Sequence, residues 1–407
     1  MAKPLHGVRV LDLCRVIAGP WSAQNLADLG AEVIKVERPG AGDDSRNWGA
    51  PFIKDRQGRD SAFTSYFTGV NRGKKSVTLD FSKPEGRDLL KRLAATSDVL
   101  LENYRTGTLP RQGLGYEDLK AVNPRLIYCS VTGFGQTGPY ARDPGYDIVF
   151  QGMSGFMSIT GEPDGKPGAG PQKTGVSIVD VLGGLYATIA VLGALAHRHN
   201  SGEGQYIDIG LLDVGIASLV SMTHLYLASG VPPKRQGNAH PTVVPYQVFE
   251  TRDGQIIVAV LTDRHFVKLC EILGRPELAE DQRFTSVGDR NIHRTELIPM
   301  LEPLFRRRTS SAWFSMLREA EVPCGPINDI AQAFADPHVR HRGMRVEIPH
   351  PEIGTIPVVA NPIRYSATPV DYRIPPPLLG QHNREVYQGL LGLSDEDLER
   401  LTASRVL

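Results

Sequence analysis

The chain has 407 residues, of which 41% are hydrophobic and 22% are charged, values typical of a globular protein of two or three domains. Lys and Arg together number 45, as do Asp and Glu, so no basic excess indicates a nucleic-acid or membrane-surface partner. The first six residues lead straight into a strand pattern, which leaves no room for a signal peptide. Four separated cysteines without metal or redox spacing predict free thiols and a cytoplasmic location, and they are Cys14, Cys129, Cys270 and Cys324.

Strand and helix patterns alternate through the first 150 residues. Strand–helix–strand units of this kind form parallel sheets. The sequence therefore predicts a doubly wound, Rossmann-like α/β domain, in which ligands bind at the carboxyl ends of the strands. The expected strands are 8–13, 31–36, 76–81, 99–102 and 126–131, and the expected helices are 21–29, 84–96 and 116–122.

An apolar run at 181–196 predicts a core helix, because its 16 residues fall short of the ~20 that span a bilayer. Asp180 precedes the run, near the positive end of the helix dipole, which favours an ionised carboxylate. Gly183 and Gly184 each cost about 0.5–1 kcal/mol in a helix, so we expect a thioester or an acyl group to approach the backbone there. Position alone leaves two roles open for Asp180, a helix cap or a catalytic group.

The rest of the chain predicts three segments. The large domain extends over 1–225, a smaller α+β domain follows a linker and covers 235–330, and a proline-rich return segment at 340–407 rejoins the large domain through a final helix. The elements expected in these segments are strands at 205–209, 246–250 and 256–261, and helices at 211–228, 266–273, 312–319 and 383–391.

A glycine motif, Gly133-Phe-Gly135-Gln-Thr-Gly138, follows a predicted strand and matches a dinucleotide-binding pattern. That pattern needs a helix directly after it, whereas Pro139 and Pro144 interrupt the next residues. A ligand-binding loop is therefore favoured over an NAD-dependent oxidoreductase. Basic residues near the strand ends either face one polyanion or belong to the solvated surface, and they are Arg38, Arg72, Lys74, Lys75, Arg105 and Arg111.

Seven motifs spread along the chain resemble the class III CoA-transferases, the superfamily of formyl-CoA transferase and carnitine dehydratase. Three segments resemble the succinate–hydroxymethylglutarate CoA-transferase group most, among them 42–49 and 375–382. The seven motifs are Arg15-Val-Ile-Ala-Gly-Pro20, Asp28-Leu-Gly-Ala-Glu-Val-Ile-Lys-Val-Glu-Arg-Pro-Gly40 with Gly42-Asp43, Asn71 with Lys74-Lys-Ser76, Glu102-Asn103, Gly145-Tyr-Asp147, Val322-Pro-Cys-Gly-Pro326 and Pro376-Pro-Leu-Leu-Gly-Gln-His382.

The resemblance implies a CoA-transferase whose nucleophile is Asp180. In this family the carboxylate attacks an acyl-CoA, and the mixed anhydride becomes an aspartyl-CoA thioester that passes CoA to an acceptor acid. CoA thioester is thus a substrate, and the resemblance implies no tightly bound cofactor and no metal. It places contacts with CoA at Ile17, Ala18, Arg38, Leu79, Ser82, Asn103, Tyr104 and Arg111.

Departures from the family pattern narrow the expected substrate. The segment 237–241 lacks the glycine-rich loop of the formyl and oxalyl enzymes, which disfavours oxalate. Tyr146 stands where related racemases carry a catalytic histidine, which disfavours the first alternative, an α-methylacyl-CoA racemase. We therefore expect succinyl-CoA as donor and a dicarboxylic acid as acceptor, with acid contacts from Arg15, Tyr146 and His240. The resemblance also implies an interlocked homodimer.

Overall fold

The computed structural model describes residues 3–49 and 51–407, and it divides into two compact units. The first comprises Met1–Phe156, Thr174–Ser229 and Arg340–Leu407, and the second comprises Met157–Lys173 and Gly230–Val339. The sequence-based boundaries differ from this division at 157–173, which groups with the second unit although we had expected it inside 1–225.

The first unit is built on a six-stranded sheet with the order β5-β2-β1-β6-β7-β8, in which every neighbouring pair is parallel. This is the strand order of the doubly wound Rossmann fold, so the predicted fold class is confirmed. The order reverses between β1 and β6. The strands are β1 (Arg9–Asp12), β2 (Glu32–Glu37), β5 (Lys74–Thr78), β6 (Val99–Glu102), β7 (Ile127–Thr132) and β8 (Tyr206–Gly210).

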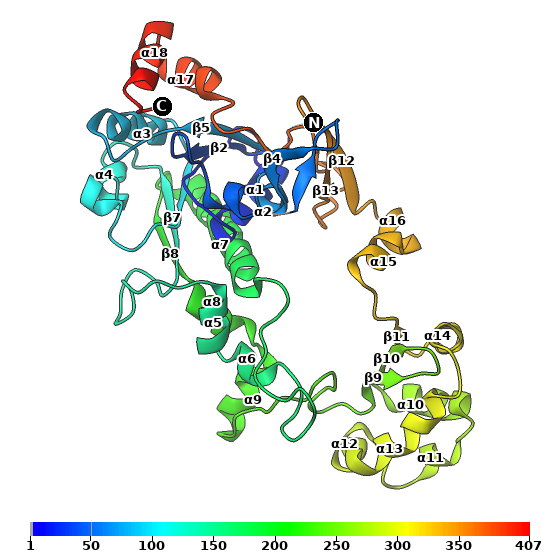
Figure 1. The fold of residues 1–407 in the computed structure, drawn as a ribbon. Coiled ribbons are helices and arrows are strands. Elements are labelled where there is room, and N and C mark those ends of the chain that lie inside the picture. Colours follow the sequence, from blue (N-terminus) through cyan, green and yellow to red (C-terminus); the bar gives the residue numbers. More distant parts are fainter. Residues whose placement is uncertain (1–2, 50) are drawn as a thin grey trace. The chain divides into compact units, whose positions relative to one another are not determined.

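Helices cover both faces of this sheet, because neighbouring strand residues point to opposite faces and both faces are apolar. Val10 packs in a core with α1 (Ala18–Asp28) and α7 (Ile178–Ser201). Leu11 packs on the other face with α3 (Pro84–Ala95) and the C-terminal helices α17 (Asn383–Leu391) and α18 (Asp395–Ala403), which lie beside α3 (Figure 1).

Two of the helix predictions need correction. The helix expected at 211–228 is two helices, α8 (Leu211–Ser218) and α9 (Ser221–Ser229), which are bent by 77°. Val220 lies at the break with a φ of 42°, a left-handed conformation that a helix cannot contain. The helix at 383–391 is confirmed as α17, but it is not the last, because α18 follows with its own capping box from Ser394.

The second unit contains a three-stranded antiparallel sheet of the order β11-β10-β9, which confirms the strands predicted at 246–250 and 256–261 and pairs them as a hairpin. Its core is made by helices that pack on one another and on these strands. The elements are β9 (Tyr246–Glu250), β10 (Gln255–Ala259), β11 (Cys324–Gly325), α10 (Asp263–Leu273), α11 (Glu277–Glu280), α12 (Val287–Ile292), α13 (Arg294–Phe305), α14 (Ser310–Glu319) and α15 (Ile330–Ala335).

The first unit also contains shorter elements, including two antiparallel hairpins, β3 with β4 and β12 with β13. The second hairpin lies in the proline-rich return segment at 340–407, for which the sequence predicts no strand. The remaining elements are η1 (Asp44–Asn47), β3 (Phe52–Lys54), β4 (Asp60–Thr64), α2 (Ser65–Val70), η2 (Pro110–Gln112), α4 (Tyr116–Lys120), α5 (Asp147–Met153), α6 (Phe156–Ile159), α16 (Pro337–His341), β12 (Arg345–His350) and β13 (Gly354–Val359).

Helix α7 is longer than its apolar run. The run at 181–196 belongs to a helix of 24 residues, so the length argument against a membrane span was wrong. Within the described residues, α7 passes a test of length and hydropathy for a membrane-spanning helix, as does the bent pair α8 and α9 taken together. One face of α7, with Ala187 and Val191, is packed in the core beside α1.

Candidate active site

A cleft lies at the carboxyl ends of β1 and β6, where the strand order reverses and where doubly wound folds bind ligands. Its walls come from the segments that follow β1, β6 and β7, and the first turn of α7 closes one side. The glycine motif after β7 forms a loop rather than opening a helix, as predicted, and Gly133 lines the cleft. The cleft brings together seven of the predicted site residues, Arg15, Ile17, Ala18, Asn103, Tyr104, Tyr146 and Asp180.

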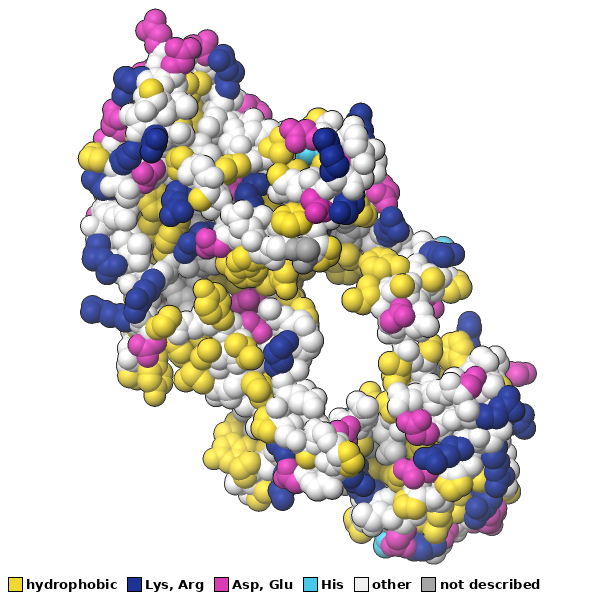
Figure 2. Space-filling view, viewed as in Figure 1, with side chains coloured by type: hydrophobic (Ala, Val, Ile, Leu, Met, Phe, Trp, Pro, Cys, Tyr) yellow, Lys and Arg dark blue, Asp and Glu magenta, His cyan; other side chains and the backbone are white. Residues whose placement is uncertain are grey.

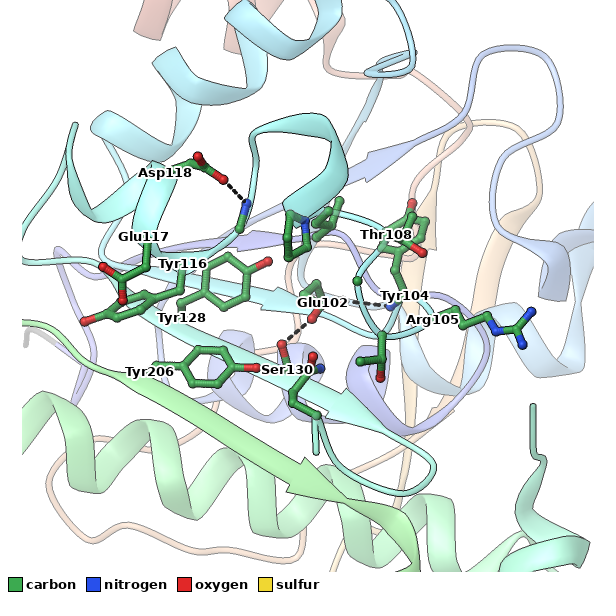
Figure 3. A pocket seen from close by; sticks show the side chains of 16 residues that line it. Glu102, Tyr104, Arg105, Thr108, Tyr116, Glu117, Asp118, Tyr128, Ser130 and Tyr206 are labelled. Atoms are coloured by element: carbon green, nitrogen blue, oxygen red, sulfur yellow. Dashed lines mark hydrogen bonds between the residues drawn. The ribbon is translucent and has the colours of Figure 1, made fainter. Parts of the chain in front are cut away.

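The side chain of Asn103 ties the ends of β1 and β6 to each other. Asn103 accepts a hydrogen bond from the Arg15 amide at 2.9 Å and donates one to the Arg15 carbonyl at 2.8 Å. Glu102 lines a further pocket, which Figure 3 shows and which shares Tyr104 and Arg105 with the cleft. Its carboxylate accepts from the Tyr104 amide at 2.7 Å and from the Ser130 hydroxyl, and both bonds are drawn in Figure 3. Burial raises the pKa of Glu102 to about 7. Asn103 thus ties the end of β1 to the end of β6, and Glu102 ties the segment after β6 to β7.

A buried ion pair supports the turn after β1. Lys35 donates to Asp43 at 2.8 Å and to the Cys14 carbonyl at 2.8 Å, and neither charged side chain is exposed. Asp43 also accepts from the Val16 amide at 3.2 Å. Val16 has a φ of 72°, which is rare for a β-branched residue, so this turn is strained and needs such support.

Asp180 is half-buried and lies in the first turn of α7, facing the cleft. Ser177 occupies the N-cap position, so the reading of Asp180 as the helix cap is wrong. Burial, followed by the negative charge of Asp147, raises the pKa of Asp180 to about 7. We had expected the helix dipole to favour the ionised form, but these two effects outweigh it.

Helix packing, and not the expected approach of an acyl group, explains why glycine occupies positions 183 and 184 of α7. A Cβ on Gly184 would lie 2.5 Å from the Ala18 carbonyl oxygen and 2.9 Å from the indole of Trp21. A Cβ on Gly183 would lie 2.4 Å from the side chain of Leu211. The two glycines therefore let α1 and α8 pack closely against α7, and the acyl group is not needed to explain them.

A second pocket adjoins the cleft and shares Arg15, Asp44 and Tyr104 with it. It contains three more of the predicted CoA contacts, Arg38, Leu79 and Ser82. Arg38 is exposed and forms no ion pair within the described part of the chain, which leaves its guanidinium open to a phosphate. Arg111 lies on η2 and lines neither of the two pockets.

Three of the other basic residues near the strand ends form ion pairs within the first unit. Arg72 is buried and paired with Asp28 at 2.6 Å, and Lys74 is fully buried and paired with Asp12 at 2.9 Å. Lys75 pairs with Glu32 and Glu385. Arg105 lines the cleft, but its guanidinium donates to the Arg142 carbonyl. The polyanion hypothesis was therefore wrong for Arg72, Lys74 and Lys75, which stabilise the fold.

His240 belongs to the second unit, in the segment before β9. Its ring stacks on Tyr246 with centroids 5.1 Å apart, and its Nδ1 accepts from the Thr242 and Val243 amides. Burial and the nearby Arg294 lower its pKa.

Among the described residues, no group of three or more His, Cys, Asp or Glu side chains is placed to hold a metal ion.

Sequence reasoning missed the role of Asp147, although the residue was part of a quoted motif. Its carboxylate accepts from the Val179 amide at 2.8 Å and from the Asp180 amide at 3.3 Å. Because these groups are more than 30 residues apart, no local pattern reveals the contact. The only available signal was the motif Gly145-Tyr-Asp147, which places an acid directly after Tyr146, a predicted acid contact.

Comparison with known proteins agrees with this geometry. The family model of CoA-transferase family III matches residues 5–383. The chain is 47% identical to the succinate–glutarate CoA-transferase of Agrobacterium fabrum over 94% of each chain. It is 42% identical to the succinyl-CoA:glutarate CoA-transferase of Homo sapiens, over 100% of this chain and 90% of the relative.

A solved structure shows the same fold. The crystal structure of a CAIB/BAIF family protein from Brucella suis superposes with a TM-score of 0.84, at 45% identity, and covers 96% of this chain and 100% of that one. The predicted resemblance is therefore confirmed. The chain belongs to the class III CoA-transferase family and is a CoA-transferase.

Proposed function

We propose that the enzyme transfers CoA from succinyl-CoA to a C4–C6 dicarboxylic acid through covalent adducts of Asp180. The position of Asp180 carries this proposal, because its carboxyl faces a ligand-binding cleft that Arg15 and the expected CoA contacts also line. The names of relatives that are 42–47% identical, which pair succinate or succinyl-CoA with glutarate, support the choice of acids.

In the first half of the reaction, the Asp180 carboxylate attacks the thioester carbonyl of succinyl-CoA. The C–S bond breaks, CoA leaves as a thiolate, and a mixed anhydride joins the succinyl group to Asp180. The thiolate then attacks the aspartyl carbonyl, succinate leaves, and an aspartyl-CoA thioester remains. The acceptor carboxylate attacks this thioester, and the same two steps in reverse release the new acyl-CoA and restore Asp180.

The chain supplies two electrostatic aids to these steps. A carboxyl with a pKa of about 7 is partly ionised at neutral pH and is more basic than an ordinary aspartate, which favours attack on a thioester. The N-terminus of α1 also faces the cleft through Ile17 and Ala18. Its unpaired amides favour the negative charge that develops on the carbonyl oxygen in the tetrahedral state.

The adjoining pocket is our proposed site for the rest of CoA. Leu79 offers an apolar contact, and Ser82 and Arg38 offer polar and cationic contacts. Arg38 would bind a phosphate, and Arg111 remains a predicted phosphate contact outside both pockets. Asn103 and Tyr104 connect the two pockets, since both line the cleft and Tyr104 lines the second pocket as well.

The donor and acceptor can be tested directly. We expect purified enzyme with succinyl-CoA to form new acyl-CoA products with C4–C6 dicarboxylic acids, glutarate among them, and much less product with oxalate or with monocarboxylic acids. Mass spectrometry of the acyl-CoA products measures this. No dicarboxyl-CoA product from any acid in the panel would refute the proposal. Deuterium exchange from solvent into an α-methylacyl-CoA without an acceptor acid would indicate a racemase instead.

Arg15 is our proposed partner for the distal carboxylate of the acid. Its guanidinium lines the cleft, half exposed, beside Tyr104 and in an ion pair with Asp44 at 3.0 Å. We expect Arg15→Gln to raise KM about tenfold or more for a dicarboxylic acid and much less for a monocarboxylic acid, because a desolvated carboxylate without a partner costs a few kcal/mol. Steady-state kinetics with glutarate and butyrate measure the difference. Equal losses for both acids would assign Arg15 to CoA binding.

His240 and Tyr146 are weaker candidates for acid contacts. Tyr146 is 71% exposed and lines the cleft, so its hydroxyl is free to reach a bound acid. The His240 ring lies in the second unit and already accepts two backbone hydrogen bonds. We therefore propose Tyr146 as a contact for the acid and keep His240 as a prediction from the sequence.

A homodimer is also part of the proposal. Helices α5, α7 and α8 pack on one another, and together with α9 they leave large apolar side chains exposed. Figure 2 shows such side chains gathered over this part of the first unit. Such a surface is typical of an interface. Its members are Ile148, Val149, Met153, Leu185, Tyr186, Ile189, Ile216, Val220, Leu225, Tyr226 and Leu227.

Four free cysteines, three of them buried, support a cytoplasmic location.

A further inference from the structure

We propose that Asp147 is a positioning residue, which holds the first turn of α7 and whose negative charge keeps the Asp180 carboxylate strongly nucleophilic. This inference rests on the proposed role of Asp180 and assigns a function to a residue outside the expected contacts with CoA and acid. Asp147 opens α5 and is buried, with only 9% of its surface exposed.

One carboxylate oxygen of Asp147 binds the start of α7. Oδ1 accepts from the Val179 amide at 2.8 Å and from the Asp180 amide at 3.3 Å. These amides have no partner inside the helix, because the first amides of any helix lack one. Asp147 therefore ties the backbone of Asp180 itself to α5, and a rigid first turn fixes where the Asp180 carboxyl points.

The second oxygen belongs to a buried polar chain. Asp147 accepts from Gln151 Nε2 at 2.5 Å, and Gln151 is fully buried. Gln151 Oε1 in turn accepts from the Thr174 amide at 2.9 Å. Asp147 thus has donors on both oxygens, and within the described residues no Lys or Arg forms an ion pair with it. Its charge therefore stays uncompensated next to Asp180.

The effect of that charge is consistent with the electrostatics of Asp180. After burial, the charge of Asp147 is the cause that raises the pKa of Asp180. A carboxylate made more basic in this way attacks a carbonyl carbon more readily. Other titratable groups face the cleft or lie on the elements packed against α7, and they are Arg15, Asp44, Tyr104, Arg105, Asp143, Tyr146, Asp28, Tyr128, Cys129, Tyr206, Asp208 and Asp213.

The test compares Asp147→Asn with wild type by the pH dependence of adduct formation from succinyl-CoA. It adds a titration of the Asp180 carboxyl by ¹³C NMR, assigned with Asp180→Asn. Asparagine keeps an acceptor for the helix amides and removes the charge. We expect the pKa of Asp180 and the acidic limb of the rate profile to move down by about one pH unit or more. The proposal would be overturned if neither the acidic limb of the pH–rate profile nor the pKa of Asp180 measured by NMR changes in Asp147→Asn.

Asp253→Asn is the matched control. Asp253 also accepts from the first amide of a helix, because its carboxylate binds the Ser310 amide of α14 at 2.8 Å, but it belongs to the second unit. We expect this variant to leave the limb and the titration of Asp180 unchanged. If the pKa of Asp180 shifts by the same amount in Asp147→Asn and Asp253→Asn, then the loss of any capping carboxylate produces the shift. That result would overturn the proposed role of Asp147.

A second variant separates orientation from charge and serves if Asp147→Asn fails to fold. Gln151→Met removes the amide that orients Asp147 but keeps the charge. We expect kcat to fall at least about tenfold while KM for succinyl-CoA and the acidic limb stay in place, and an unchanged kcat would overturn the proposal. The NMR titration needs no turnover. Absence of any adduct in wild type would therefore refute the proposed function, while the titration would still decide the role of Asp147.

Discussion

Replacing Asp180 by alanine is expected to reduce CoA transfer by at least about 1,000-fold, because loss of a covalent nucleophile removes the reaction path itself. The cleft offers no equivalent carboxylate in the same setting. Asp44 is paired with Arg15, and Asp143 is exposed. Neither lies in the first turn of α7, where burial and Asp147 raise the pKa of Asp180 to about 7.

Two measurements decide whether Asp180 acts as the nucleophile. Hydroxylamine should trap an activated aspartyl group on a peptide containing Asp180 in wild type incubated with succinyl-CoA, and mass spectrometry should find no such product in Asp180→Ala. Calorimetry should show that the variant still binds CoA within a few-fold of wild type. Asp143→Ala is the matched control and is expected to retain most of its activity. Turnover of Asp180→Ala near the wild-type rate would remove Asp180 from the mechanism.

The sequence predicted the architecture well, because the signals that it used are local. Period-two and period-3.6 patterns identify strands and helices, and the handedness of their connections then restricts the sheet to few strand orders. The α8–α9 break escaped prediction because Val220 is an ordinary apolar residue in an apolar run, and only the packing of the chain produces its left-handed φ of 42°.

The predictions about the site were wrong where a residue interacts with a partner that is distant in the sequence. Arg72 and Lys74 stand at strand ends like ligand-binding residues, but Asp28 and Asp12 neutralise them from other elements. The glycines of α7 allow neighbouring helices to pack closely. The sequence alone cannot distinguish this role from the close approach of a ligand, because both require glycine. Likewise, the dipole argument for Asp180 was sound in itself, but it omitted burial and a second carboxylate.

Removing the buried partner of Lys35 is expected to have the largest effect on stability. Asp43→Ala leaves a cation without an ion pair in a place where neither side chain is exposed, and this typically costs about 3–5 kcal/mol of unfolding free energy. The variant also loses the hydrogen bond from the strained Val16 amide. Chemical denaturation at pH 7 monitored by circular dichroism measures the loss. Activity should fall as well, since the turn of Val16 lines the cleft.

The sign of the pH dependence follows from the pKa of Asp43, which lies at about 2, lowered chiefly by Lys35 against the opposing effect of burial. A carboxyl with a depressed pKa contributes its full stability above its unfolded value of about 4 and loses it as the pH falls toward 2. The difference between wild type and Asp43→Ala should therefore be complete at pH 7 and shrink below pH 4. Asp44→Ala is the control, because its ion pair with Arg15 is half exposed and contributes at most about 1 kcal/mol. If both variants lose the same small amount, then the buried pair does not stabilise the turn, and the Val16 conformation must be held by the rest of the strand end.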